Sequence, residues 1–293
     1  MEDIDLSDHK VTSEVHVFSE SSSNSGESVV TSVFKFSLPL NFVGIAAPAG
    51  KEGDADDDGD LLVRRKNHVD DYCLEIKHHV NTSLDLVGLQ VWRGALLLAD
   101  FLLHLSAELK ITQDKSILEL GAGTGISSIV AGMVTKQVLS TDIAKGNILS
   151  LIRTNVEQNS KWIRGQIGVE ELDFYKHDYP ANLVTQVEQA NIIIAADVVY
   201  HDDLTDAFLS TLKNLMSMGR QKIALIALEK RFVFTLAELE VAAPCYEYFY
   251  DNLFREFSPD YSIEQLNTQL IPQYFCYERC KELVLFRITT KKQ

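Results

Sequence analysis

The chain has 293 residues, of which 46% are apolar and 24% are charged, and its formal net charge is -15. This length is enough for one large α/β domain with an extension, and the composition is that of a globular protein. The sequence has no run of about 18 apolar residues that would span a membrane and no basic, apolar leader. Four scattered cysteines form neither a disulfide framework nor a zinc-ligand pattern: Cys73, Cys245, Cys276 and Cys280. We therefore expect a soluble intracellular protein, in the nucleus and/or cytoplasm, without a metal site.

The acidic charge is concentrated near the N-terminus, where residues 1–60 contain 13 Asp and Glu but only 3 Lys. Such an acidic lobe disfavours direct contact with the phosphate backbone of nucleic acid and would attract a basic protein, although it also simply favours solubility. Residues 19–25 are rich in serine, and residues 51–60 contain six acids. Together these stretches predict a partly mobile extension over residues 1–70. Short apolar runs at residues 15–18 and 29–40 predict strands within it.

From residue 71 to residue 293, the pattern predicts one domain in which strands and helices alternate. A strand is expected at residues 74–80 and a helix at residues 91–105, from the spacing of their apolar residues. Short apolar runs predict buried parallel strands at residues 116–120, 137–142, 167–172, 191–197 and 222–228. Helical spacing predicts helices at residues 126–134, 148–159 and 204–218. This alternation is typical of a parallel sheet covered by helices on both faces.

The C-terminal segment departs from this alternation. Residues 262–275 and 283–289 are predicted to be strands, and only residues 276–282 lie between them. A connection this short cannot cross over between parallel strands, so we expect an antiparallel hairpin.

A glycine-rich loop follows the predicted strand at residues 116–120 and opens a helix, with an acid and three glycines at Glu119, Gly121, Gly123 and Gly125. Glycines let the backbone turn sharply and approach a ligand, and the helix N-terminus offers free N–H groups. The dinucleotide pattern GxGxxG is broken by Ile126, and Glu119 would repel a pyrophosphate but suits a cationic sulfonium. Asp142 ends the next strand and is placed to bind ribose hydroxyls. The pattern therefore predicts an S-adenosylmethionine site rather than an NAD site.

These features resemble the seven-strand class I methyltransferases, and most of all the lysine-specific branch called methyltransferase family 16. The resemblance covers residues 72–290 and rests on segments 91–95 (VWRGA), 119–125 (ELGAGTG), 172–174 (LDF), 197–206 (DVVYHDDLTD) and 229–231 (EKR). It implies an α/β, Rossmann-like, seven-stranded sheet of strand order 3-2-1-4-5-7-6, with helices on its flanks and an antiparallel last hairpin. The N-terminal strands would then form a β extension to this fold.

The resemblance also implies roles for individual residues. The cofactor-binding residues would be Trp92, Glu119, Gly121, Gly123, Gly125, Asp142, Asp173 and Ala196. Two of these have structural alternatives, because Trp92 also suits the core and Asp173 also suits an ordinary loop. Glu229 and Arg231 are expected to form an ion pair that holds the end of a strand.

Asp197 and Tyr200 belong to a D/E-x-x-Y/F signature that implies contact with an acceptor lysine. A carboxylate can orient an ammonium group, and an aromatic face can host a cation. The lysine must lose its proton before it attacks, and a pocket of low dielectric beside a sulfonium promotes that loss without a dedicated base. Catalysis would then consist mainly of in-line positioning.

The expected activity is therefore S-adenosylmethionine-dependent protein-lysine N-methylation of a non-histone protein. The resemblance suggests a basic, nucleic-acid-associated nuclear substrate, and we expect a monomer that binds neither nucleic acid nor membrane directly. Three alternatives stay open: a methyltransferase of small molecules or nucleic acid, a non-catalytic interaction module, and an NAD-dependent oxidoreductase. The first is disfavoured because residues 197–200 lack an Asn-Pro-Pro-Tyr signature, the second because the glycine loop is intact, and the third because of Ile126.

Overall fold

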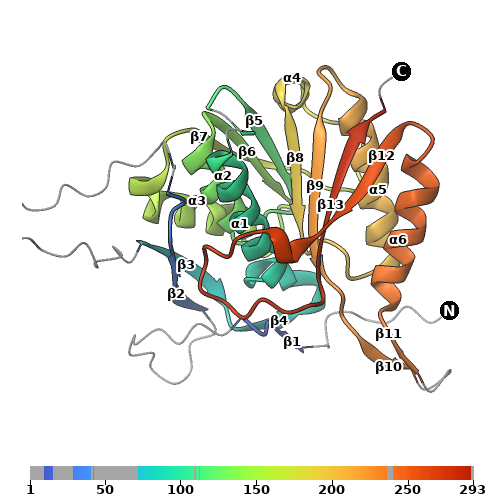
Figure 1. Cartoon of the computed structure of the whole chain (residues 1–293), viewed down its shortest axis with the longest axis horizontal. Coiled ribbons are helices and arrows are strands. Elements are labelled where there is room, and N and C mark those ends of the chain that lie inside the picture. The colour runs from blue at the N-terminus through green and yellow to red at the C-terminus, as the bar shows by residue number, and fades with distance from the viewer. Residues whose placement is uncertain are drawn as a thin grey trace, which may run out of the picture.

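A computed structural model describes residues 10–15, 29–40, 42, 72–108, 110–111, 113–235 and 240–291 of the chain (Figure 1). Its centre is a seven-stranded sheet of order β7-β6-β5-β8-β9-β13-β12. The strands are β5 (Ser116–Leu120), β6 (Gln137–Asp142), β7 (Gln166–Glu171), β8 (Ile192–Ala196), β9 (Ile223–Glu229), β12 (Tyr261–Leu266) and β13 (Leu283–Thr290). Numbered along the chain, this is the predicted order 3-2-1-4-5-7-6, and β13 is antiparallel to both of its neighbours.

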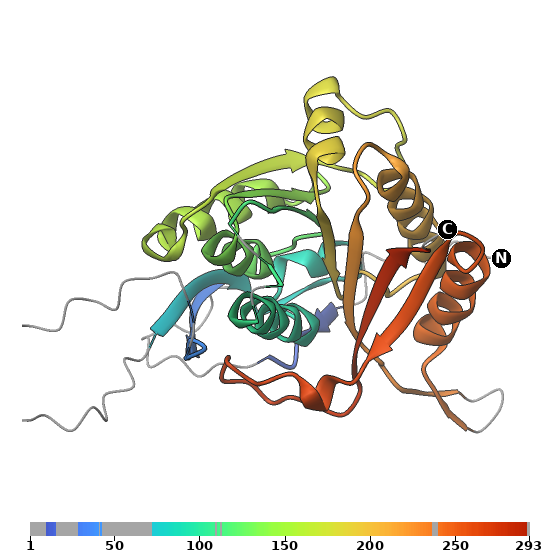
Figure 2. The same ribbon diagram turned by 45° about the horizontal axis from the view of Figure 1, so that its top comes forward.

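Helices cover both faces of this sheet (Figure 2). One face carries α1 (Arg93–Ala107), α2 (Ile126–Val134) and α3 (Ile148–Gln158), and the other carries α4 (Ala181–Gln189), α5 (Asp202–Ser217) and α6 (Pro244–Phe257). The segment Leu84–Ala107 is long and apolar enough to cross a membrane by composition, but 72% of its apolar stretch is buried inside this domain. Its helix α1 packs against α2, β9 and β13, which explains why apolar residues occur on most of its sides.

The N-terminal strands form the predicted β extension. β2 (Val29–Phe36) pairs antiparallel with β3 (Tyr72–His79), and β1 (Lys10–Thr12) pairs with β4 (Asn81–Ser83). Asn155 and Asn159 of α3 accept hydrogen bonds from the β3 backbone, at 2.8 Å from Lys77 N and 3.0 Å from Glu75 N. Of the strand predicted at residues 15–18, only Val15 is described and it is not in a strand. The proposed division of the chain near residue 70 stays a prediction.

The prediction for the C-terminal connection is wrong in its bounds. β12 ends at Leu266, and residues 267–282 form a long connection that includes η3 (Thr268–Leu270). The strand gives way to η3 at Asn267, whose side chain accepts a hydrogen bond from Gln269 N at 3.0 Å. Further along, the backbone N–H groups of Tyr274 and Phe275 both donate to Asp100 Oδ1 in α1, each at 2.8 Å. The connection is also held by an ion pair between Arg279 and the buried Asp100.

Further elements of the described residues were not expected from the sequence. They are α4, α6, the two-stranded ribbon of β10 (Val233–Thr235) and β11 (Glu240–Ala242), and the short helices η1 (Leu84–Leu89) and η2 (Ser160–Trp162). The ribbon extends β9 beyond the sheet, next to the start of α6 (Figure 1).

Candidate active site

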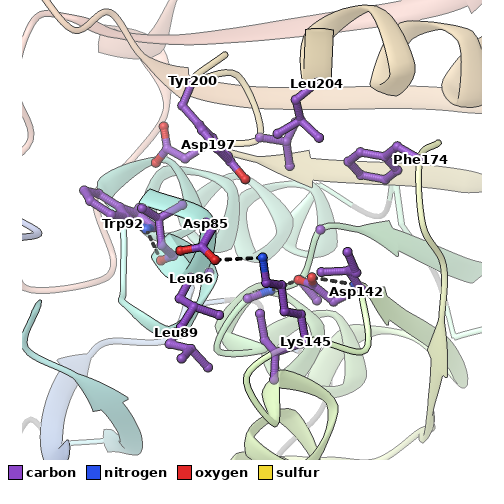
Figure 3. Close-up of a pocket in the computed structure, with 18 of the residues that line it drawn as sticks. Asp85, Leu86, Leu89, Trp92, Asp142, Lys145, Phe174, Asp197, Tyr200 and Leu204 are labelled. Atoms are coloured by element: carbon purple, nitrogen blue, oxygen red, sulfur yellow. Dashed lines mark hydrogen bonds and ion pairs between the residues drawn. The ribbon is translucent and has the colours of Figure 1, made fainter. Parts of the chain in front are cut away.

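A cavity of about 400 Å³ lies at the carboxyl ends of β5, β6 and β8 (Figure 3). The segments that line it are η1, the start of α1 and the loops that follow β5, β6, β7 and β8. Every predicted site residue except Gly125 lines this cavity: Trp92, Glu119, Gly121, Gly123, Asp142, Asp173, Ala196, Asp197 and Tyr200. The fold therefore gathers residues that are up to about a hundred positions apart in the sequence, as open α/β sheets do at this edge.

The glycine loop wraps the N-terminus of α2. Gly121, Gly123 and Gly125 have φ values of 64°, 57° and 82°, in the left-handed region that favours glycine. A Cβ atom on Gly123 would lie 2.8 Å from the carbonyl oxygen of Gly88, so the loop touches the η1 segment directly. Gly125 is the residue before α2 and shapes the turn instead of facing the cavity.

Glu119 is almost completely buried at the base of the loop. Its carboxylate accepts a hydrogen bond from the Ser128 hydroxyl of α2. The pKa of Glu119 is raised to about 8, mainly by burial and also by the nearby Asp142 carboxylate, while the contacts with the serine hydroxyls of α2 lower it. A cation in the cavity would therefore favour the ionised form of Glu119.

Asp142 connects the end of β6 to the glycine loop. Its Oδ2 accepts from Gly123 N and its Oδ1 from Ile143 N, both at 2.7 Å. Burial raises the pKa of Asp142 to about 6, although these two amide bonds lower it. The carboxylate thus holds the loop in place, and its predicted contact with ribose hydroxyls would use the remaining lone pairs.

One wall of the cavity is formed by η1, which the sequence analysis did not identify. Lys145 Nζ lies 2.7 Å from the Asp85 carboxylate of η1, and this ion pair spans the cavity above Asp142 (Figure 3). Leu86, also in η1, breaks the helical geometry with φ -121° and packs against Gly146. The only sequence signal for this wall is Asp85 next to an apolar stretch, which has no regular period.

Asp197 connects three elements that are distant in the sequence. Its Oδ2 accepts from Gly94 N at 2.6 Å and its Oδ1 from Glu229 N at 2.9 Å. Gly94 is in the first turn of α1, where backbone N–H groups have no partner within the helix, so Asp197 caps α1 from β8. A Cβ atom on Gly94 would lie 2.5 Å from Asp197 Oδ2. Asp197 itself has a φ of 52°, a conformation that Asp tolerates better than most residues.

The end of β9 is held by Arg93, which the sequence indicated only as part of the family segment at residues 91–95. Arg93 Nη1 lies 2.8 Å from Glu229 Oε1, and the predicted ion pair between Glu229 and Arg231 is also present, at 3.9 Å. Arg231 also stacks on the Trp92 ring, with its guanidinium carbon 4.4 Å from the ring centre. Trp92 is further oriented by a 2.9 Å hydrogen bond from its indole N–H to the Val87 carbonyl. The Trp92 ring, which forms the aromatic wall of the cavity, is thus held in place by contacts with Val87 and Arg231.

Residues 68–240 match the sequence profile of a family described as lysine methyltransferase. The chain belongs to this family. Methyltransferase-like protein 22 of Mus musculus is 33% identical over 238 residues, which cover 74% of this chain and 59% of that protein. The Homo sapiens protein of the same name is 32% identical over 260 residues, 80% of this chain and 62% of its own length. Protein-lysine methyltransferase METTL21E of Bos taurus is 31% identical over 144 residues, 46% of each chain. The chain spans about three fifths of the length of the first two relatives.

The part that matches the lysine methyltransferase family contains every residue that lines the cavity. Two of these residues have surroundings that bear on their expected roles. The Asp173 carboxylate accepts from Tyr175 N at 3.0 Å and lies 3.3 Å from Lys176 Nζ, so much of its bonding capacity is used within its own turn. Tyr200 extends into the cavity (Figure 3), where burial and the Asp142 carboxylate raise the pKa of its phenol well above the usual range. Tyr200 therefore stays neutral at physiological pH.

Proposed function

We propose that this chain is an S-adenosylmethionine-dependent protein-lysine N-methyltransferase that acts by direct in-line transfer. One observation carries the proposal: a glycine loop on a helix N-terminus and the Asp197–Tyr200 turn face the same cavity. The first is suited to a cofactor and the second to an amine. The family match and the names of the relatives support the same activity.

The cavity residues fit this cofactor. Gly121 and Gly123 leave no side chain between the loop and the ligand, and the α2 N-terminus behind them favours a carboxylate. Asp142 lies where ribose hydroxyls would donate, and the buried Glu119 would favour the cationic end of the ligand. When bound, S-adenosylmethionine supplies an electrophilic methyl group. Apolar side chains of the cavity, among them Phe174, would pack on its adenine ring.

The acceptor amine would be held by Asp197, Tyr200 and the Trp92 wall. Both Asp197 oxygens already accept one backbone N–H, and each keeps a second lone pair for an ammonium or amine group. The apolar part of the lining and the positive charge of a bound cofactor would lower the pKa of an incoming lysine, against the opposite effect of the Asp197 carboxylate, and its proton would leave to water. Tyr200 cannot act as a phenolate base because its pKa is raised, so it orients the amine by a hydrogen bond or through its ring. Positioning of this kind can supply about 7–11 kcal/mol of the barrier.

We further propose that the substrate is a non-histone protein with a basic, nucleic-acid-associated character, and that the enzyme acts as a monomer in the nucleus and/or cytoplasm. The acidic residues 1–60 favour a basic partner. We also propose that the chain divides into an acidic extension, residues 1–70, and a methyltransferase domain, residues 71–293.

The test is incubation of the purified chain with a cell lysate and cofactor labelled in its methyl group. Protein bands that yield labelled methyl-lysine after acid hydrolysis are expected, and Gly123→Arg, which blocks the loop, should yield none. Label found only in nuclease-sensitive or small-molecule fractions would refute a protein-lysine acceptor and favour the alternative substrates. Absence of both label and S-adenosylmethionine binding would instead favour a non-catalytic module.

A further inference from the structure

A second depression, of about 450 Å³, lies at the opposite edge of the sheet, where β5, β6 and β7 begin. All of its lining residues are polar or charged, in contrast to the cavity at the other edge. Four of them are cations: Lys115, Lys136, Arg164 and Arg220. Asp114 is the one carboxylate of the lining, in a chain whose formal net charge is -15. The sequence places these cations in four different turns, so only the fold brings them together.

Among the described residues, acids form an ion pair with only one of the four cations. Lys115 lies 3.2 Å from Asp114 and forms an ion pair with it. Lys136, Arg164 and Arg220 form no side-chain ion pair with any residue in the described part of the chain. Glu188 contacts Arg220 through its backbone, because its carbonyl oxygen accepts a hydrogen bond from Arg220 N at 3.1 Å. Its carboxylate interacts electrostatically with the buried Lys222. The depression therefore keeps an excess of positive charge.

The turns that carry these cations are held by backbone hydrogen bonds. Arg164 N donates to the Gly132 carbonyl at 2.9 Å, and Gln166 N donates to the Lys136 carbonyl at 2.8 Å. A Cβ atom on Gly165 would lie 2.2 Å from the Thr135 carbonyl oxygen, so the turns of Arg164 and Lys136 are in direct contact. Because the backbone is already fixed, a ligand would need to order only the side chains, which lowers the cost of binding.

The chemistry of the donors selects the ligand. Guanidinium groups bind tetrahedral oxyanions in a bidentate way, and Lys136 adds a point charge. Lys136, Arg164 and Arg220 have no ion pair among the described residues. Three such cations match a ligand with two or more negative charges better than they match a single carboxylate. The overall negative charge of the chain repels anions at long range, so affinity must come from these local contacts.

We propose that this depression is a binding site for a phosphate-bearing anion, held by Lys136, Arg164 and Arg220 and separate from the methyl-transfer cavity. The phosphate could belong to a free small molecule or to a phosphorylated side chain of a protein partner. The site lies at the amino ends of the strands, so it stays accessible while the cavity at their carboxyl ends is occupied.

The test is calorimetric titration of the full chain with inorganic diphosphate at low ionic strength, with excess S-adenosylhomocysteine present to fill the cofactor cavity. Saturable one-to-one binding is expected, and the double variant Arg164→Ala, Arg220→Ala should bind about tenfold more weakly or worse. The matched control removes two exposed cations elsewhere, Arg255→Ala with Lys281→Ala, and should bind like the unmodified chain. Lys136→Ala tests the site with a single exposed change.

A second titration compares a phosphoserine peptide with its unphosphorylated form. Tighter binding of the phosphopeptide than of diphosphate identifies a phosphorylated partner as the source, and the reverse order identifies a free anion. The proposal is overturned by the absence of saturable binding of both probes, or by equal affinity in the double variant and the control. Loss of binding when S-adenosylhomocysteine is added would also overturn it, because the anion would then occupy the cofactor cavity.

Discussion

Replacing Asp197 by Asn tests whether this carboxylate holds the candidate site together, in addition to its proposed contact with the acceptor. Asn tolerates the left-handed backbone at φ 52° and keeps the size of the side chain. Its amide nitrogen, however, is a donor and would face either Gly94 N or Glu229 N, where Asp197 offers an acceptor. One of the two backbone N–H groups therefore loses its partner.

Such a loss costs about 1–3 kcal/mol for a buried donor. Water in the cavity replaces part of the lost bonding, because Asp197 is only partly buried, so about 1–2 kcal/mol is expected. For a chain of this size, each kcal/mol lowers Tm by about 2–4 °C. Asp197→Ala would remove both acceptors and place Ala in the left-handed region, which together costs about 3–8 kcal/mol. That is a large share of the stability of a typical domain, so Asn is the informative substitution.

The assay combines thermal unfolding, S-adenosylhomocysteine binding and methyl-transfer kinetics on Asp197→Asn, Gly94→Ala and the double variant. Gly94→Ala perturbs the same carboxylate from α1 without changing its charge, because its Cβ would lie 2.5 Å from Oδ2. The two substitutions should be markedly non-additive in Tm, and both should reduce kcat more than cofactor affinity. An unchanged Tm for Asp197→Asn, or strictly additive effects, would refute the idea that Asp197 links α1 to β9.

Three further outcomes are expected. The pKa of Glu119 in the folded chain, about 8, exceeds its ordinary value of 4.5, so the free energy of unfolding should fall as pH rises through this range. Glu119→Gln should flatten the corresponding curve of Tm against pH, and an equally steep curve would contradict the assignment. Gly123→Ala should weaken S-adenosylmethionine binding about tenfold or more by calorimetry, because Ala is strained at φ 57° and its Cβ meets the Gly88 carbonyl. Gly168→Ala, whose Cβ would have only ordinary contacts, is the matched control. Tyr200→Phe should lower kcat with little change in Tm, since the phenol forms no hydrogen bond with any described residue, and an unchanged kcat would remove Tyr200 from the acceptor site.

The features that were predicted correctly depend on local order in the chain. Strand, glycine loop and helix follow one another directly, so spacing alone identifies the loop from Glu119 to Gly125 and the strand that ends at Asp142. The strand order also follows from alternation together with the family resemblance. α6 could have been predicted too, because Pro244 opens it and Phe249, Leu253 and Phe257 recur at helical spacing.

The features that were missed depend on contacts between distant residues. Nothing near Asp197 in the sequence indicates that its oxygens bind Gly94 and Glu229, because these contacts exist only once β8, α1 and β9 lie side by side. The same holds for the C-terminal connection, where Asp100 takes the N–H groups that a strand would have used. Alternation of apolar residues reveals neither this acceptor nor the turn at Asn267 that opens η3, so the predicted strand was too long.

Through its contacts, the Asp197 carboxylate influences both the aromatic wall of the cavity, formed by Trp92, and the stability of the domain. Trp92 directly precedes α1, whose first turn is held by Asp197, and Arg231 follows β9, whose last residue is held by the same side chain. Since Arg231 stacks on Trp92, a shift of either element would change the shape of the aromatic wall. A functional acid that only touched substrate could be replaced at the cost of activity alone. At this position, loss of activity should be accompanied by loss of stability, and the ratio of the two losses separates the positioning role of Asp197 from its proposed contact with an amine.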